Sequence, residues 1–137
     1  IFLLLGNTAA FAQKKKEVKD ADKLFKNEQY EEALPLYRKF INMDANNVDY
    51  VYKYGSCLVM VTDQVDEALK MLLKAEEMGK SDDEIAYFLG RAYEKKKDYA
   101  KAITYYQRFT VAASKDDVKK LKVKKRIKSC KKAQKKQ

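Results

Sequence analysis

Two cysteines are the side chains in this sequence best suited to nucleophilic or metal chemistry. Cys57 and Cys130 lie 73 positions apart and form no CxxC pair, so the sequence lacks the closely spaced thiolates of zinc and iron–sulfur sites. It has no histidine, which removes the commonest general base and metal ligand. It also lacks a GxSxG motif, a glycine-rich phosphate loop and paired acids for a cleft. We therefore expect no enzyme activity, no metal, no cofactor and no small-molecule substrate.

Lysine and arginine are the second group of candidate functional residues, because their positive charge could bind an anionic partner. Residues 114–137 carry twelve of them and two aspartates, which accounts for the net charge of +10 of the whole chain. Such a dense run of positive charge is typical of segments that bind anionic surfaces. The candidate basic patch consists of Lys119, Lys122, Lys124, Lys125, Arg126 and Lys128.

Three interpretations of this basic segment stay open. It could be a solvated helix that covers the end of the fold, it could contact an anionic membrane or envelope polymer, or it could bind nucleic acid. The run from residue 119 to residue 128 has no aromatic side chain that could stack on nucleobases, which argues against nucleic acid.

Helices must position these residues, because turn-forming residues are scarce. The 137 residues suffice for one domain and include four glycines and one proline, against 46% hydrophobic residues. An internal repeat is visible in three segments that share a central alanine, with spacings of 35 and 34. The central alanines are Ala33, Ala68 and Ala102. The small residues Ala21, Gly55 and Gly90 lie upstream, and we expect them to face the alanines where paired helices cross most closely.

This pattern resembles the tetratricopeptide repeat (TPR). Tyr54-Gly55 with Leu58 in the second segment matches Leu89-Gly90 with Tyr93 in the third. Seven positions after the central alanines stand Phe40, Ala75 and Phe109. The resemblance implies an all-α, right-handed TPR superhelix of three helix-turn-helix repeats plus a C-terminal capping helix. The repeats are expected at about residues 14–47, 48–82 and 83–115 and the capping helix at about 116–134, within a domain spanning residues 13–137. The expected helices are residues 15–27, 30–43, 48–61, 65–79, 82–96, 99–112 and 116–134.

The capping helix is expected to cover the apolar face that the last repeat leaves open. Its apolar stripe consists of Val118, Leu121, Val123, Ile127, Cys130 and Ala133. In this fold Cys57 lies on the first helix of the second repeat, two helix layers from Cys130. Two layers of about 10 Å each exceed the Cα separation of roughly 7 Å that a disulfide allows. We therefore predict two free and largely buried thiols.

The resemblance also implies that a protein or peptide partner binds in the concave groove, which the first helix of each repeat lines. The candidate groove residues are Val18, Asp22, Phe25, Tyr52, Ser56, Val59, Tyr87, Arg91, Glu94 and Lys95. Tyr52, Tyr87 and Arg91 form the expected centre, because tyrosine and arginine bury large areas and still form hydrogen bonds. The alternative is that both tyrosines are ordinary half-buried side chains.

The expected groove lacks the carboxylate clamp of chaperone-binding TPR domains, which grips a C-terminal carboxylate with Lys and Asn. Val18 stands where the first Lys of the clamp is expected, and Asp22 replaces the Asn that follows it. Glu84 replaces a later Lys. Both acids would repel a carboxylate, so a chaperone tail is disfavoured as the ligand.

The first twelve residues resemble the end of a secretory signal peptide. An apolar start runs into Ala10-Phe11-Ala12, the A-x-A pattern that signal peptidase cleaves, here after Ala12. Such a run is too short to span a membrane, which takes roughly 20 apolar residues. The alternative is a buried first helix.

The combination of this leader with the repeats resembles the N-terminal TPR region of OmpA-family envelope proteins from Bacteroidetes-type bacteria. The Tyr54–Leu58 stretch and the closing Arg126–Ala133 stretch add to this resemblance. It implies a periplasmic or outer-membrane-associated scaffold that is exported by a cleaved signal peptide. An anionic envelope surface, contacted through the basic patch, is the alternative partner that the lysine-rich segment indicates.

Overall fold

Residues with high helix propensity fill this sequence, and the structure is all-helical, as predicted. The computed structural model describes residues 2–81 and 83–137, and the side chains from residue 6 onward. Within these ranges it contains eight α-helices and no strand. The helices are α1 (Phe2–Lys26), α2 (Tyr30–Met43), α3 (Val48–Val61), α4 (Val65–Glu77), α5 (Asp83–Lys95), α6 (Tyr99–Ala112), α7 (Lys115–Lys120) and α8 (Val123–Gln134).

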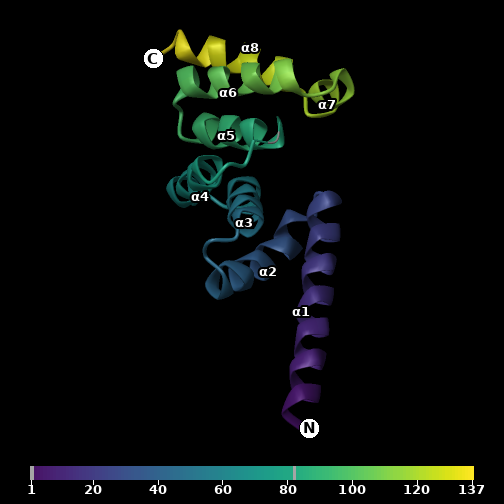
Figure 1. Ribbon diagram of the computed structural model, residues 1–137. Helices are drawn as coiled ribbons and strands as arrows, with labels where there is room; N and C mark the ends of the chain where they lie inside the picture. Colours follow the sequence, from purple (N-terminus) through teal and green to yellow (C-terminus); the bar gives the residue numbers. More distant parts are fainter. Residues whose placement is uncertain (1, 82) are drawn as a thin grey trace.

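The helices pack as consecutive pairs along one array (Figure 1). Helix α1 packs on α2, α3 on α4 and α5 on α6, and each pair contacts the next. Helix α8 covers α6 at the C-terminal end, while the first half of α1 extends away from the other helices. This is the predicted order of three helix-turn-helix repeats followed by a capping segment.

Among the described residues, side-chain caps begin three of the helices. Asn47 Oδ1 accepts a hydrogen bond from the Tyr50 amide at 3.1 Å, at the start of α3. Asp98 Oδ1 accepts one from Lys101 at 3.2 Å for α6, and the Ser114 hydroxyl accepts one from Asp117 at 3.1 Å for α7. Each bond satisfies an amide that the first helical turn leaves without a partner.

Glycine allows the closest helix crossings in the second and third repeats. A Cβ on Gly90 would lie 2.6 Å from two ring carbons of Tyr106, and a Cβ on Gly55 would lie 3.0 Å from Leu72 Cγ. The central alanines are fully buried, as expected. However, the glycines face the residues one helical turn beyond Ala68 and Ala102, because the neighbouring helix presents Leu72 and Tyr106 at the crossing.

Most of the helix boundaries match the expected ones. The structure reproduces the ranges 30–43, 48–61 and 99–112, while the fourth helix ends two residues earlier than predicted, at Glu77. The fifth begins at Asp83, and its predicted start at residue 82 lies outside the described residues.

The predicted single capping helix is wrong, because α7 and α8 are separate helices. The break falls at Leu121 and Lys122, and Lys122 adopts a left-handed backbone conformation with φ of 54°. In one continuous helix, Val118 and Val123 would lie about 140° apart around the axis. The break buries both valines, which are 7% and 0% exposed.

Helix α1 begins earlier than the predicted residue 15 and runs without interruption from Phe2 to Lys26. Residues 6–16 are exposed, and Ala21 is its first buried side chain among those described. The segment predicted as a signal peptide therefore forms the first turns of α1, except residue 1, which lies outside the described residues. In the described part of the chain, no helix is both long and apolar enough to cross a bilayer.

Candidate functional site

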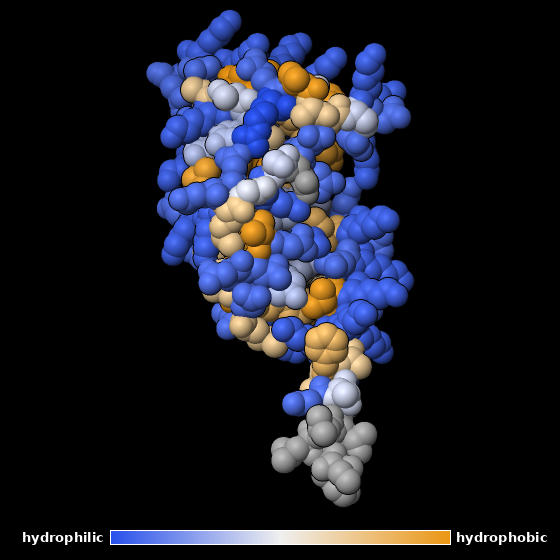
Figure 2. Space-filling model, viewed as in Figure 1, coloured by the Kyte–Doolittle hydropathy of each residue, from blue (hydrophilic) through white to orange (hydrophobic). Residues whose placement is uncertain are grey.

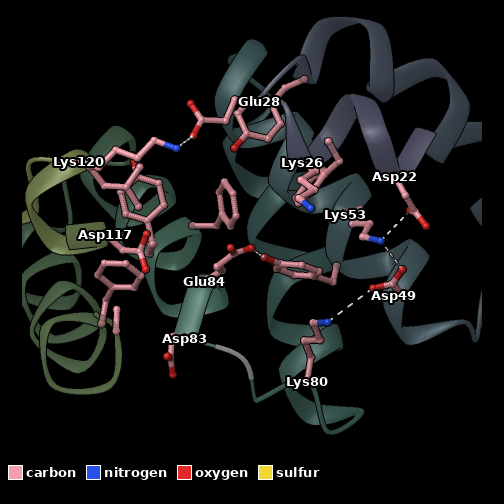
Figure 3. A pocket seen from close by; sticks show the side chains of 18 of the residues that line it. Asp22, Lys26, Glu28, Asp49, Lys53, Lys80, Asp83, Glu84, Asp117 and Lys120 are labelled. Carbon is pink, nitrogen blue, oxygen red and sulfur yellow. Dashed lines mark hydrogen bonds and ion pairs between the residues drawn. The ribbon is translucent and has the colours of Figure 1, made fainter. Parts of the chain in front are cut away.

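One candidate site is a groove of about 830 Å³ along the first helices of the repeats. We call it the concave groove (Figure 3). Its lining consists of Asp22, Phe25, Lys26, Glu28, Tyr30, Asp49, Tyr52, Lys53, Lys80, Ser81, Asp83, Glu84, Tyr87, Phe88, Phe109, Ala113, Asp117, Lys120 and Leu121. These residues come from every repeat and from α7, so the groove exists only when the whole array is folded.

Aromatic rings form the floor of the concave groove. The Phe25 ring lies 5.9 Å from Tyr52 and 6.1 Å from Phe88, and Tyr52 lies 6.0 Å from Phe88. Tyr87 continues the cluster, 5.4 Å from Phe88 and 5.7 Å from Phe109. Such contacts fix the ring positions and give a rigid apolar surface. Tyr52 is 2% and Tyr87 5% exposed, so the tyrosines are more deeply buried than either sequence interpretation assumed.

Ion pairs form one wall of the concave groove. Lys53 Nζ lies 2.7 Å from Asp22 Oδ1 and 2.6 Å from Asp49 Oδ2, and Lys80 Nζ lies 3.6 Å from Asp49. Burial alone would lower the pKa of Lys53, but hydrogen bonds to the two carboxylates outweigh it and raise this pKa above its usual value. Lys53 therefore stays charged and holds α3 against α1.

A further ion pair closes the groove between its two ends. Lys120 Nζ of α7 lies 2.7 Å from Glu28 Oε1 in the turn between α1 and α2, 92 positions away in the sequence (Figure 3). Both side chains are about half exposed or more, so the pair contributes little to stability. It nevertheless brings the capping segment to the first repeat.

The structure places only part of the predicted groove residues in this lining. Asp22, Phe25, Tyr52 and Tyr87 line the concave groove. Ser56 and Val59 are fully buried, and the Ser56 hydroxyl donates to the Tyr52 carbonyl at 2.8 Å. The other predicted residues outside the lining are Val18, Arg91, Glu94 and Lys95.

Arg91 and Glu94 belong instead to a polar network between α5, α6 and α8. The Arg91 guanidinium donates to the Tyr87 hydroxyl at 2.9 Å. Glu94 accepts a hydrogen bond from the Tyr106 hydroxyl and pairs with Arg126 Nη1 at 3.2 Å. Burial and the bond to Glu94 raise the pKa of Tyr106 above its usual range, so the phenol stays protonated. The network fastens α8 to the third repeat.

Sequence reasoning missed the charged residues that the turns bring to the groove. Glu28 and Lys80 lie in the connections between helices, where the helical pattern carries no information about the direction of a side chain. Asp117 and Lys120 reach the groove because the capping segment breaks into two helices. Nothing in the local sequence indicated that α7 would meet the first repeat.

A second cavity, of about 600 Å³, lies at the junction of α6, α7 and α8. We call it the cationic cavity, and its lining consists of Thr110, Lys115, Val118, Lys119, Lys122, Lys124 and Lys125. Four of the six predicted basic-patch residues line it, together with Lys115, which the prediction did not include. Arg126 turns toward Glu94 instead, and Lys128 is exposed outside the lining.

The two cysteines are free and buried, as predicted. Cys57 is 0% and Cys130 1% exposed. Burial raises the pKa of the Cys57 thiol to about 12 and that of Cys130 to about 11, so neither is a reactive thiolate at neutral pH. In the part of the chain that the structure describes, no group of three or more His, Cys, Asp or Glu residues could hold a metal ion.

Comparison with known proteins identifies the repeats. A family model described as anaphase-promoting complex, cyclosome, subunit 3 matches residues 26–109, from the end of α1 into α6. The chain belongs to this family. Membership rests on the TPR-like repeats, and the matched range covers the groove-forming segments from Lys26 to Phe109. No curated protein sequence matches the chain.

Two solved structures show the same fold. The TPR domain of Arabidopsis OM64 matches with a TM-score of 0.68 and 16% sequence identity, covering 88% of this chain and 96% of that one. The N-terminal domain of stress-induced protein-1 (STI-1) from C. elegans matches with a TM-score of 0.50 and 23% identity, covering 81% and 93%. At these identities the likeness shows the fold alone, which confirms the TPR superhelix. TPR domains are typically non-catalytic modules that bind proteins or peptides.

Proposed function

We propose that this TPR protein is an interaction scaffold and that its concave groove binds a segment of a partner protein. The observation that carries the proposal is a continuous groove of about 830 Å³ with an aromatic floor and charged walls. Rigid aromatic surface is the usual source of binding energy in protein interfaces, and charged walls select the partner. The structure supplies both before any partner arrives.

The charges of the groove favour a partner segment with an apolar anchor beside basic residues. Three of the carboxylates, Asp22, Asp49 and Glu28, already pair with groove lysines. Asp83, Glu84 and Asp117 form no ion pair within the described residues, and they gather near α5 and α7 (Figure 3). A lysine or arginine of the partner would pair with them, whereas a C-terminal carboxylate would be repelled.

Photo-crosslinking tests the groove. A photoreactive amino acid would replace Lys26 and, separately, Glu84, because both line the groove and both are exposed. Lys70, exposed on α4 outside the lining, serves as the control position. We expect both groove positions to capture the same protein and Lys70 to capture none. Equal capture from Lys70 would refute the groove as the binding site.

A charge-matched pair of variants tests the partner's chemistry. Asp83→Asn with Glu84→Gln removes two groove carboxylates, while Asp63→Asn with Glu77→Gln removes two exposed carboxylates outside the lining. If basic residues of the partner contact Asp83 and Glu84, the first variant should reduce crosslinking from a probe at Lys26 about tenfold. The second variant should leave it unchanged. An unchanged crosslinking yield in both variants would show that the partner segment is not basic, while the groove would remain the proposed binding site.

We also propose that the protein acts outside the cytoplasm, as a periplasmic or outer-membrane-associated scaffold. Support comes from the leader resemblance and from exposure, because cleavage after Ala12 would remove no buried side chain among residues 6–12. N-terminal sequencing of the protein from a secreting bacterial host should then begin at Gln13. Ala10→Arg with Ala12→Arg should block the cleavage, and an uncleaved wild-type chain in the cytoplasm would contradict the proposal.

A further inference from the structure

The five lysines of the cationic cavity gather on one surface and have no carboxylate partner within the described residues. Elsewhere, ion pairs bind Lys39 to Glu17, Lys96 to Asp66 and Arg108 to Glu76. By contrast, no ion pair reaches Lys115, Lys119, Lys122, Lys124 or Lys125 in the described part of the chain, and no carboxylate lines their cavity. Five positive charges around one cavity create a local positive potential that attracts an anion.

Lys122, which lines the cationic cavity, also has an unfavourable backbone conformation. A left-handed conformation, with φ of 54°, is unfavourable for a residue with a side chain, and glycine would adopt it freely. Strained backbone persists where the surrounding structure needs it, and it gathers at functional sites. Here the left-handed residue turns the chain between α7 and α8 and brings lysines of both helices around one cavity.

The start of α8 carries no negative charge of its own. Lys122 provides no capping hydrogen bond from its side chain, and no acidic residue stands in the first turn of α8. The partial positive charge of a helix start normally favours an acid there, yet the sequence places Lys124 and Lys125. An external anion would satisfy both the lysines and the helix start.

We propose that the cationic cavity binds a compact group of two or more phosphates, carried either by a soluble ligand or by a lipid headgroup. Lysine is a common phosphate partner because it acts as a mobile point charge. The cavity volume of about 600 Å³ lies in the range of small-ligand pockets. Its lining has no aromatic side chain for stacking nucleobases, which disfavours single-stranded nucleic acid.

Calorimetric titration with inorganic tripolyphosphate at physiological salt tests this proposal on the full chain. The cavity variant is Lys122→Gln, Lys124→Gln and Lys125→Gln. The control variant is Lys128→Gln, Lys131→Gln and Lys132→Gln, which removes the same amount of charge from α8 outside the lining. Thermal melting would first show that both variants fold. We expect the dissociation constant to rise about tenfold or more in the cavity variant and less than about threefold in the control.

Two further arms identify the source of the phosphates. Flotation with vesicles of phosphatidylcholine and cardiolipin, whose headgroup carries two phosphates, should recover the wild type if the ligand is a lipid. Recovery must fall in the cavity variant and be absent with phosphatidylcholine alone. Tripolyphosphate binding without flotation would support a soluble ligand.

Three outcomes would overturn the proposal. The first is no measurable tripolyphosphate binding by the wild type. The second is an equal loss in the cavity and control variants, because the segment would then act only as an unstructured positive charge. The third is tighter binding of a single-stranded oligonucleotide than of tripolyphosphate, with the same loss in both variants, which would assign the basic segment to nucleic acid.

Discussion

The concave groove and the cationic cavity differ in whether their lysines are paired with carboxylates of the protein. In the groove, Lys53, Lys80 and Lys120 pair with carboxylates of the protein itself. The cavity is lined by five lysines without such partners within the described residues. Ion pairs hold the groove wall in one conformation before a partner binds. The unpaired lysines attract anions through their electrostatic potential, so anion binding to the cavity should weaken steeply with salt. This difference is why we propose a peptide for the groove and phosphate for the cavity.

The two regions also differ in how much of the chain builds them. The residues that line the groove run from Asp22 to Leu121, so the groove forms only when the whole array is folded. The cavity takes residues from Thr110 to Lys125 and needs only the last repeat and the cap. Solenoids can lose structure at one end while the remainder persists. The cavity should therefore open more easily than the groove.

Thiol labelling should show the largest difference between the regions, because each has one buried cysteine nearby. Cys57 lies in α3, which supplies Tyr52 and Lys53 to the groove and packs against α2, α4 and α5. Cys130 lies in α8, which packs mainly on α6. Local opening of the terminal helix should make Cys130 react about a hundredfold faster than Cys57 with a thiol reagent under native conditions.

Mass spectrometry of labelled peptides measures the two rates, and the single variants Cys57→Ser and Cys130→Ser verify the assignment. Tripolyphosphate should slow the labelling of Cys130 and leave Cys57 unchanged, since it binds only the region that contains α8. Equal rates for the two thiols would mean that the array opens as one unit, and the contrast between the regions would disappear.

Replacing Glu94 tests the connection between the regions. Glu94→Ala removes the acceptor of the Tyr106 hydroxyl and the partner of Arg126, whose side chain is 31% exposed. Leaving a half-buried arginine and a buried hydroxyl without acceptors should cost about 2 kcal/mol of unfolding free energy. Chemical denaturation measures this loss.

The matched control for Glu94 is Glu77→Ala, which truncates an exposed acid at the end of α4. If the network fastens α8, then Glu94→Ala should also speed the labelling of Cys130 more than that of Cys57. A loss of stability with an unchanged ratio of the two rates would show that Glu94 supports the whole array instead.

Lys53 tests how much the paired wall contributes to the groove. Its side chain is 15% exposed and pairs with two carboxylates, so Lys53→Met should reduce the unfolding free energy by about 1.5 kcal/mol. The control Lys96→Met breaks a pair whose lysine is 51% and aspartate 85% exposed, and should change it by less than about 0.5 kcal/mol. Similar losses in both variants would contradict a structural role for the groove pairs.

The sequence predicted the repeat more completely than the sites, and the reason is physical. Periodic small residues such as Gly55 and Gly90 reflect packing that recurs along the array, so the repeat pattern located the helices between residues 30 and 112 to within two residues. The groove depends on which way each side chain points. The repeat positions assigned Ser56 and Val59 to the groove, yet both lie in the core because α3 is covered on most sides.

Contacts between distant parts of the chain could not be predicted at all. The pair of Lys120 with Glu28 depends on the curvature of the complete array and on the break at Lys122. The sequence does contain one indication of this break. Val118 and Val123 cannot lie on the same face of one continuous helix, and both are buried. The cationic cavity follows from the same turn, so the basic run indicated its charge but not its shape.

Replacing single lysines by glycine should give the smallest effects and separates strain from function. Lys97 and Lys122 both have left-handed backbone, with φ of 64° and 54°, but only Lys122 lines the cationic cavity. Glycine pays little for this conformation, so Lys97→Gly and Lys122→Gly should each raise the unfolding free energy by about 0.5–1 kcal/mol, seen as a higher melting temperature. Only Lys122→Gly should also weaken tripolyphosphate binding, because it removes a cavity charge. A variant at Lys122 that gains stability without losing affinity would show that the left-handed turn serves the fold alone.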